Sequence, residues 1–168
     1  MAMSSGQTKW LRDKLKAVDF LTDLNGDDLS VLIQTISPLS VFAGQTIIRQ
    51  GQKCGASYMI CTGEADVWAD TSNGREKLVT IGEGSLFGEI SILTGDVCNA
   101  TVTAKNDIEL FVVPAQGMKR LAQANPNLAV KIAERIASRK GAKALDAQSG
   151  ATKSNLINRV KAFLTKKV

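Results

Sequence analysis

The segment from Phe87 to Ala104 contains the residues whose types and spacing best suit ligand binding. Gly88 lets the backbone approach a bound molecule closely, because glycine has no Cβ. The short apolar run after it fits one turn of helix whose N-terminal amides would face an anion. Glu89 supplies a carboxylate that can accept hydrogen bonds from sugar hydroxyls. The alternative for Glu89 is a capping or turn glutamate satisfied by nearby backbone amides.

Catalytic chemistry has little support elsewhere in the sequence. Histidine is absent, so the commonest general base and metal ligand is missing, and Ser-His or Cys-His pairs cannot form. The three cysteines, Cys54, Cys61 and Cys98, include no Cys-x-x-Cys pair, so we predict reduced thiols with neither a disulfide framework nor a zinc site. Cys98 is expected to be a small hydrophobic residue, with a redox-sensitive thiol in electropositive surroundings as the alternative. We therefore expect no enzyme and no obligatory cofactor.

Hydrophobic periodicity divides the chain into helical and β regions. The pattern predicts helix from Lys9 to about Ile36, broken at Asn25-Gly26-Asp27. Between Ser40 and Pro114, short alternating apolar runs separated by glycines predict an all-β barrel or sandwich. The expected strands are Thr46–Arg49, Tyr58–Thr62, Ala65–Asp70, Lys77–Ile81, Thr101–Ala104 and Glu109–Val113. Asn73-Gly74 predicts a type I′ hairpin turn, whose two central residues need positive φ.

After Pro114 the pattern returns to helix. The first predicted helix is Gln116–Ala124, and a second begins with Asn125 as its cap and Pro126 in its first turn. The second helix has an apolar stripe that suits core packing, with pairing to a second copy as the other interpretation. Its members are Leu128, Ile132 and Ile136. Residues 141–154 have the composition of a linker, and residues 155–168 form a short basic amphipathic helix that should dock on a partner.

Charge is distributed unevenly along the chain. The net charge is +5, but the residues from Gly117 onward contain twelve basic and two acidic side chains. The preceding part is therefore mildly acidic. A basic tail of this kind predicts an acidic partner, a nucleic acid, a membrane surface or the acidic body itself as its contact, while a solvated helical face explains any single lysine.

The segment Phe87–Ala104, read as FGEISILTGDVCNATVTA, resembles the phosphate-binding cassette of the cyclic nucleotide-binding domain family. This family includes the regulatory subunits of cAMP-dependent kinase, gated ion channels and catabolite-activator-type regulators. Further matching pieces are Phe42-Ala43-Gly44-Gln45, Gln50-Gly51, Tyr58-Met59-Ile60, Gly63-Glu64-Ala65 and Gly82-Glu83-Gly84-Ser85. The resemblance implies a mainly β domain with flanking helices, a double-stranded β-helix or jelly-roll. It divides the chain into a helical segment 1–36, a β-roll with lid helices 37–140, the linker and the basic helix.

The resemblance also implies a ligand-binding site. Its residues are Phe87, Gly88, Glu89, Ile90, Ser91, Cys98, Asn99 and Ala100. In the family a glutamate at the position of Glu89 binds the ribose 2′-hydroxyl. Asn99 stands where relatives carry a small residue or a threonine that helps to distinguish purines, and its amide can bond a base or only the local backbone.

One position departs from the family pattern. Cys98 stands where the family has an arginine that clamps the cyclic phosphate, and Val97 replaces the usual proline before it. A hydrogen bond to a charged group is worth about 1.5 to 3 kcal/mol, and about 1.4 kcal/mol is tenfold in affinity. We therefore expect cAMP or cGMP to bind at least about ten- to a hundredfold more weakly than in a pocket with the arginine, unless Lys105, Arg49 or a cation of the tail substitutes.

Two functions are compatible with these features. The first is a stand-alone regulatory sensor that binds cAMP or cGMP weakly, or a related small anion, and signals through the helices after Pro114. The alternative is a ligand-independent protein docking module that uses the β-roll surface and the basic tail. Homodimerisation and membrane contact stay open, whereas specific DNA binding is not expected because the residues beyond Ala142 are too few for a helix-turn-helix domain. The start of the sequence lacks the apolar core of a secretory signal, so we expect a cytoplasmic protein.

Overall fold

The computed structural model of the chain describes residues 2–18, 21–22, 24–127, 130–131 and 134. These residues belong to two compact units. The first unit contains the β strands and the short helix α3 (Glu89–Thr94). The second contains α1 (Ser5–Lys16), α2 (Gly26–Gln34) and α4 (Ala115–Ala124), apart from the first residue of α4.

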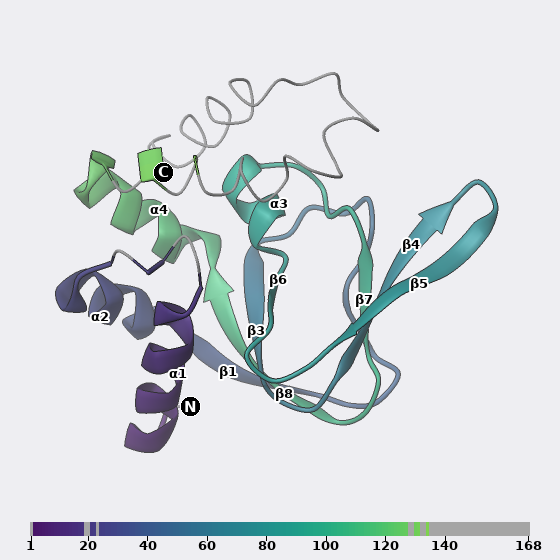
Figure 1. The fold of residues 1–168 in the computed structure, drawn as a ribbon, viewed down its shortest axis with the longest axis horizontal. Coiled ribbons are helices and arrows are strands. Elements are labelled where there is room, and N and C mark those ends of the chain that lie inside the picture. The colour runs from purple at the N-terminus through teal and green to yellow at the C-terminus, as the bar shows by residue number, and fades with distance from the viewer. Residues whose placement is uncertain (1, 19–20, 23, 128–129, 132–133, 135–168) are drawn as a thin grey trace. The chain divides into compact units, whose positions relative to one another are not determined.

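The first unit is a roll of two four-stranded antiparallel sheets (Figure 1). One sheet has the order β1 (Ser37–Val41), β8 (Ile108–Pro114), β3 (Ala56–Thr62) and β6 (Leu86–Phe87). The other has the order β2 (Thr46–Ile48), β7 (Thr101–Ala104), β4 (Ala65–Thr71) and β5 (Gly74–Ile81). Strands distant in sequence are thus neighbours in each sheet. The arrangement confirms the predicted fold class, a mainly β domain with helices before and after it.

Six strands lie where the sequence predicts them, with ends that differ by up to three residues. The two that the sequence analysis missed are β1 and β6. β1 begins Ser-Pro and has no fully buried residue, so its sequence lacks the usual strand alternation. β6 has only two residues, which is too short for any periodicity to appear.

The β4–β5 hairpin confirms the predicted reversal but corrects its turn type. Thr71 pairs with Gly74, which leaves Ser72 and Asn73 as the central residues. Gly74 has a φ of 112°, whereas no described residue other than glycine has positive φ. Asn73 therefore does not adopt the left-handed conformation that a type I′ turn needs at this position. The hydroxyl of Thr71 donates to the Gly74 carbonyl at 2.9 Å and supports the turn instead.

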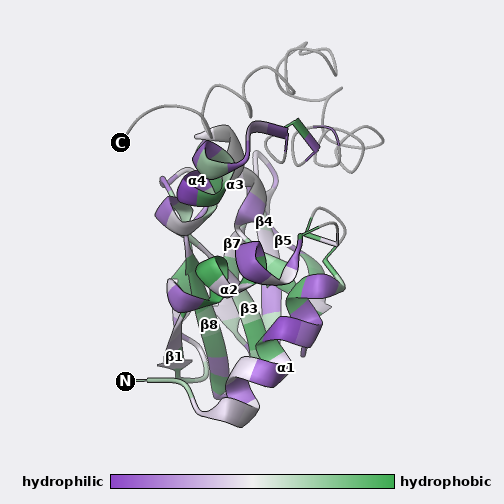
Figure 2. Ribbon diagram, turned by 90° about the vertical axis from the view of Figure 1, so that its left-hand side faces the viewer, coloured by the Kyte–Doolittle hydropathy of each residue, from purple (hydrophilic) through white to green (hydrophobic). Residues whose placement is uncertain are grey.

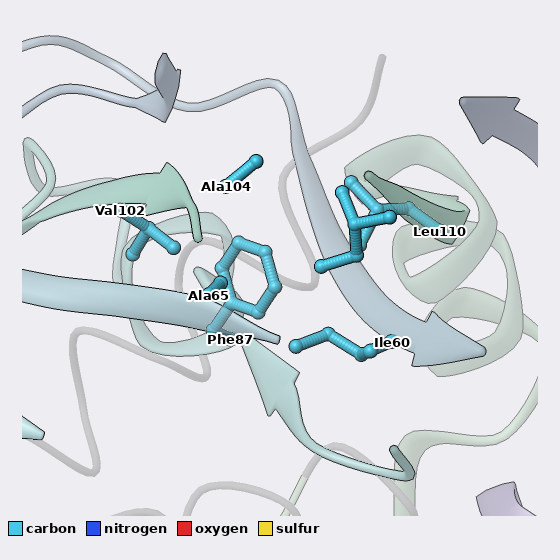
Figure 3. Close-up of a cluster of buried hydrophobic side chains, with 7 residues drawn as sticks. Ile60, Ala65, Phe87, Val102, Ala104 and Leu110 are labelled. Atoms are coloured by element: carbon cyan, nitrogen blue, oxygen red, sulfur yellow. The ribbon is translucent and has the colours of Figure 1, made fainter. Parts of the chain in front are cut away.

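The hydrophobic core of the roll lies between the two sheets, with Phe87 near its centre (Figure 3). Its members are Ile60, Ala65, Phe87, Val102, Ala104, Ile108 and Leu110. Hydrophobic residues are densest along β3 and β8 (Figure 2). These two strands occupy the middle of their sheet, and most of their residues are buried or half-buried.

The helices of the second unit begin at clear capping signals. Ser4 and Gln7 form a reciprocal capping box at the start of α1. Asn25 caps α2, accepting a hydrogen bond from the backbone N–H of Asp28 at 2.8 Å. The predicted break in the N-terminal helix is thus confirmed, although Gly26 and Asp27 already belong to α2.

The helix predicted over Gln116–Ala124 is confirmed as α4. The apolar stripe of the next helix, the linker 141–154 and the basic helix 155–168 lie outside the described residues. Within the part of the chain that the structure covers, no helix has both the length and the apolar character of a membrane span.

We expect Gly63→Ala to destabilise the roll by about 1 to 3 kcal/mol. Gly63 has a φ of 92°, and an added Cβ would stand 2.6 Å from the carbonyl oxygen of Asp107. The backbone of Asp107 would have to shift to make room for this Cβ. Urea unfolding measures the loss, with Gly55→Ala as the control because open space surrounds that glycine and its φ is not positive. Gly55→Ala should stay within about 0.5 kcal/mol of the parent, and equal stability of both variants would contradict the argument.

Candidate ligand-binding site

The first half of the cassette is a tight strand-to-helix turn. Gly88 is the N-cap of α3 with a φ of 77°, a conformation that favours glycine. A Cβ at this position would lie 3.4 Å from the carbonyl oxygen of Ala56, so the backbone also packs closely. Gly95, with a φ of 76°, ends α3 and donates its N–H to the Ser91 carbonyl at 2.9 Å. The short helix predicted after Gly88 is therefore present.

The second half of the cassette is held against the loop between β2 and β3. The backbone N–H of Cys98 donates to the Gln52 carbonyl, and the Gly51 N–H donates to the Cys98 carbonyl, both at 2.8 Å. Val97 also forms an isolated antiparallel bridge with Lys53. These contacts fix where the cassette turns back from α3 toward β7.

The two halves line a partly open cavity of about 220 Å³ in the roll. Seven of the eight predicted site residues line it, and the side chain of the eighth, Ile90, lies outside what the structure describes. The seven are Phe87, Gly88, Glu89, Ser91, Cys98, Asn99 and Ala100. The cassette thus forms one continuous wall of the cavity.

The other walls are apolar residues that the sequence analysis did not assign to the site. They are Ile48, Val67, Ile81, Leu86 and Val102. They come from five different strands. The alternating pattern of each strand could have marked these residues as inward-facing. Only the topology shows which inward-facing residues meet at the cassette.

Glu89 is the charged residue of this cavity and is largely buried, with 7% of its surface exposed. It occupies the first position of α3, where the partial positive charge of the helix end stabilises a carboxylate. Ser91 is buried to a similar extent, and its hydroxyl donates to the Val97 carbonyl at 3.3 Å. The cavity therefore offers polar oxygens at the cassette and an apolar surface opposite.

None of the described residues that line the cavity carries a positive charge. Lys105 pairs instead with Glu64 at 3.4 Å on the surface. Arg49 lines a second, more polar cavity of about 280 Å³, together with Lys53. Neither Lys105 nor Arg49 lines the ligand cavity, and the cations of the tail beyond residue 134 lie outside the described residues.

Cys98 is bonded to Cys54, which corrects the expectation of three reduced thiols. Their Cα atoms are 6.4 Å apart, within the usual range for a disulfide. The sequence carried no signal of this pair because 44 residues separate the cysteines. The backbone contacts between the cassette and the β2–β3 loop bring them together. Among the described residues, no three histidine, cysteine, aspartate or glutamate side chains group as metal ligands.

The strands and the cavity define a β-roll of two antiparallel sheets with a cavity at the cassette. The family model described as "Cyclic nucleotide-binding domain" matches residues 38–125, just over half of the chain. The chain belongs to the cyclic nucleotide-binding domain family. The resemblance stated from the cassette is therefore confirmed.

Solved structures share this fold at low sequence identity. The regulatory domain of Toxoplasma gondii PKA, solved with cAMP, has a TM-score of 0.71 at 19% identity over 96% of this chain and 60% of its own. The sensor domain of the transcriptional regulator DNR from Pseudomonas aeruginosa has a TM-score of 0.69 at 19% identity, over 87% of this chain and 99% of its own. The catabolite activator protein of Thermus thermophilus has a TM-score of 0.64 at 23% identity, over 76% and 61%.

Curated relatives are much longer than this chain. A lysophospholipase, NTE1 of Chaetomium globosum, is 34% identical over 102 residues, which are 60% of this chain and 7% of that enzyme. Its counterpart in Neurospora crassa is 29% identical over 128 residues, 76% of this chain and 8% of the enzyme. The similarity is therefore confined to a small part of each enzyme.

Cys61 gives a test of the electrostatics of the roll. Burial raises the pKa of its thiol, and the nearby charges of Glu83 and Glu109 raise it further. The thiolate is the reactive form, so we expect iodoacetamide to alkylate Cys61 severalfold more slowly than a model thiol at the same pH. The midpoint of the alkylation rate against pH should lie at higher pH for Cys61 than for the model thiol. Glu83→Gln should shift this midpoint toward lower pH. Glu76→Gln is the control, and coincident profiles of Glu83→Gln and the parent would contradict the charge effect.

Proposed function

We propose that this chain is a regulatory sensor that binds cAMP or cGMP weakly in the cavity behind the cassette. The observation that carries the proposal is the placement of Glu89, buried at the first position of α3 and on the cavity wall. Membership of the cyclic nucleotide-binding domain family supports the same conclusion. Two similar structures, the Toxoplasma gondii PKA regulatory domain and PfPKA-R, contain bound cAMP.

The polar and apolar walls of the cavity suit different parts of a nucleotide. The Glu89 carboxylate accepts hydrogen bonds from the ribose hydroxyls, and the backbone amides around Gly88 face the phosphate. The apolar side chains of Val67, Ile81 and Val102 cover one side of the ligand. A mostly apolar pocket with a few convergent polar groups is typical of small-molecule sites.

The affinity is low because the described residues of the cavity include a sugar-binding group but no phosphate-binding cation. Cys98, which stands at the position of the family arginine, is 2% exposed and disulfide-bonded to Cys54. A phosphate would therefore lose one charge-assisted hydrogen bond, worth about 1.5 to 3 kcal/mol. A related small anion that needs fewer donors is the second ligand class for the same cavity.

The output of the sensor runs through the helices after Pro114. We place the signal on α4 and on the residues that follow it, and the basic tail then recognises an acidic protein partner in the cytoplasm. This part of the proposal rests on the charge of the tail and on its position after the sensor.

A ligand-independent docking module is the alternative, and one observation favours it. Several large apolar side chains of the roll are exposed, with Phe42 at 66%, Leu78 at 56% and Val79 at 51%. Leu78 and Val79 lie on the β4–β5 hairpin, which extends away from the other strands (Figure 1). Exposed apolar surface of this kind is available for a protein partner.

We expect Glu89→Gln to reduce the affinity for cAMP by about tenfold or more, because the charged acceptor of the ribose is lost. Isothermal titration calorimetry measures the change. Glu83→Gln is the matched control, since Glu83 does not line the cavity, and it should bind as the parent does. If the parent and Glu89→Gln bind cAMP equally well, Glu89 does not contact the ligand. If the parent gives no heat at high micromolar cAMP, the sensor proposal is wrong.

Cys98→Arg should bind cAMP at least about tenfold more tightly than Cys98→Ser, because only the first restores a phosphate clamp. The two variants share the loss of the disulfide, so their difference isolates the guanidinium. Calorimetry with cAMP and cGMP gives both affinities. Failure of Cys98→Arg to bind either nucleotide would favour the docking module.

A further inference from the structure

The Cys54–Cys98 disulfide stands between the two cavities of the roll. Cys98 lines the ligand cavity, and Cys54 lines the polar cavity of about 280 Å³. Ile48 contributes to both. A change at this bond therefore alters the wall of the ligand cavity, while the second cavity gives small molecules from solvent a route to Cys54.

Backbone contacts hold the two cysteines opposite each other independently of the bond between them. Residues 51 and 52 make two hydrogen bonds of 2.8 Å to the backbone of Cys98, and the next pair along, Lys53 and Val97, forms a β-bridge. These contacts persist when the sulfurs are reduced, so the thiols stay within reach of each other. Closure is then an intramolecular step with a high effective concentration.

We propose that Cys54 and Cys98 are a reversible redox pair, and that their disulfide raises the affinity of the ligand cavity. The redox reaction follows from the geometry of the two cysteines and does not depend on any ligand. The effect on affinity rests on the proposed function, because it concerns the ligand of that cavity.

A peroxide can close the pair in two balanced steps. The Cys54 thiolate attacks one oxygen of hydrogen peroxide, the O–O bond breaks, and a sulfenic acid and hydroxide form. The Cys98 thiol then attacks the sulfenic sulfur, the S–S bond forms, and water leaves with the thiol proton. In sum two thiols and one peroxide give one disulfide and two waters. Arg49 and Lys53 line the same cavity as Cys54. A dithiol reverses the oxidation by thiol–disulfide exchange.

The bond affects the ligand through the residues that follow Cys98. Asn99 and Ala100 line the ligand cavity and connect Cys98 to β7. With the disulfide closed, this segment is covalently held to the β2–β3 loop in the geometry that leaves the cavity open. Such preorganisation raises affinity because less ordering remains for the ligand to impose. Reciprocity requires that a ligand preferring the closed form also makes the disulfide harder to reduce.

The full chain carrying Cys61→Ser tests the proposal, because this variant leaves only the paired cysteines. Hydrogen peroxide should form a disulfide between Cys54 and Cys98, and dithiothreitol should reduce it again. Peptide mapping without reductant detects the linked peptides after each treatment. Amide hydrogen exchange of residues 97–104 should be slower in the oxidised form. Titration calorimetry with cAMP should show about tenfold tighter binding by the oxidised form. Cys54→Ser in the same background is the control, and it should behave as the reduced form with or without peroxide.

The outcomes separate this inference from the proposed function. Absence of the Cys54–Cys98 link after peroxide, or a link that dithiothreitol cannot reopen, overturns the redox pair whatever cAMP does. If the link forms but exchange and cAMP affinity are equal in both forms, the regulatory effect is overturned. If neither form binds cAMP, the proposed function fails, and slower exchange in the oxidised form still supports control of the cavity wall by the disulfide.

Discussion

The backbone attachment of Cys98 to the loop between β2 and β3 is the constraint on which the candidate site depends. Without the two hydrogen bonds to residues 51 and 52, the chain after α3 would have no fixed path back to β7. Gly88 sets the other end of the cassette through its left-handed backbone and close packing against β3. Between these two ends the cassette lines the ligand cavity.

The charge pattern of the cavity is the second determinant. A buried carboxylate is costly unless hydrogen bonds or positive potential compensate it, and the end of α3 provides part of that compensation for Glu89. In the family an arginine would complete the balance. Here the described lining has no cation. In the proposed function, such a lining suits the hydroxyl donors of a sugar better than a phosphate.

Much of this site could be predicted from the sequence because the cassette is contiguous. Residues 87–91 and 98–100 act as one segment, so their order along the chain was enough to place them together. The apolar walls could not be predicted, because Ile48, Val67 and Ile81 meet only through the pairing of strands distant in sequence. The Cys54–Cys98 bond was missed for the same reason, and β1 and β6 because they carry no periodic signal.

In the proposed function, a bonded cysteine at the cassette position where the family pattern has an arginine exchanges one source of affinity for another. A guanidinium attracts the phosphate directly, and its contribution is present in every redox state. A disulfide has no attraction for the ligand, but it restricts the segment that bears Asn99 and Ala100 and so reduces the ordering that binding requires. Only the second contribution can be removed by a reductant. In the proposed sensor this contribution controls occupancy, because a small change in free energy shifts the occupied fraction most when the ligand concentration lies near the dissociation constant.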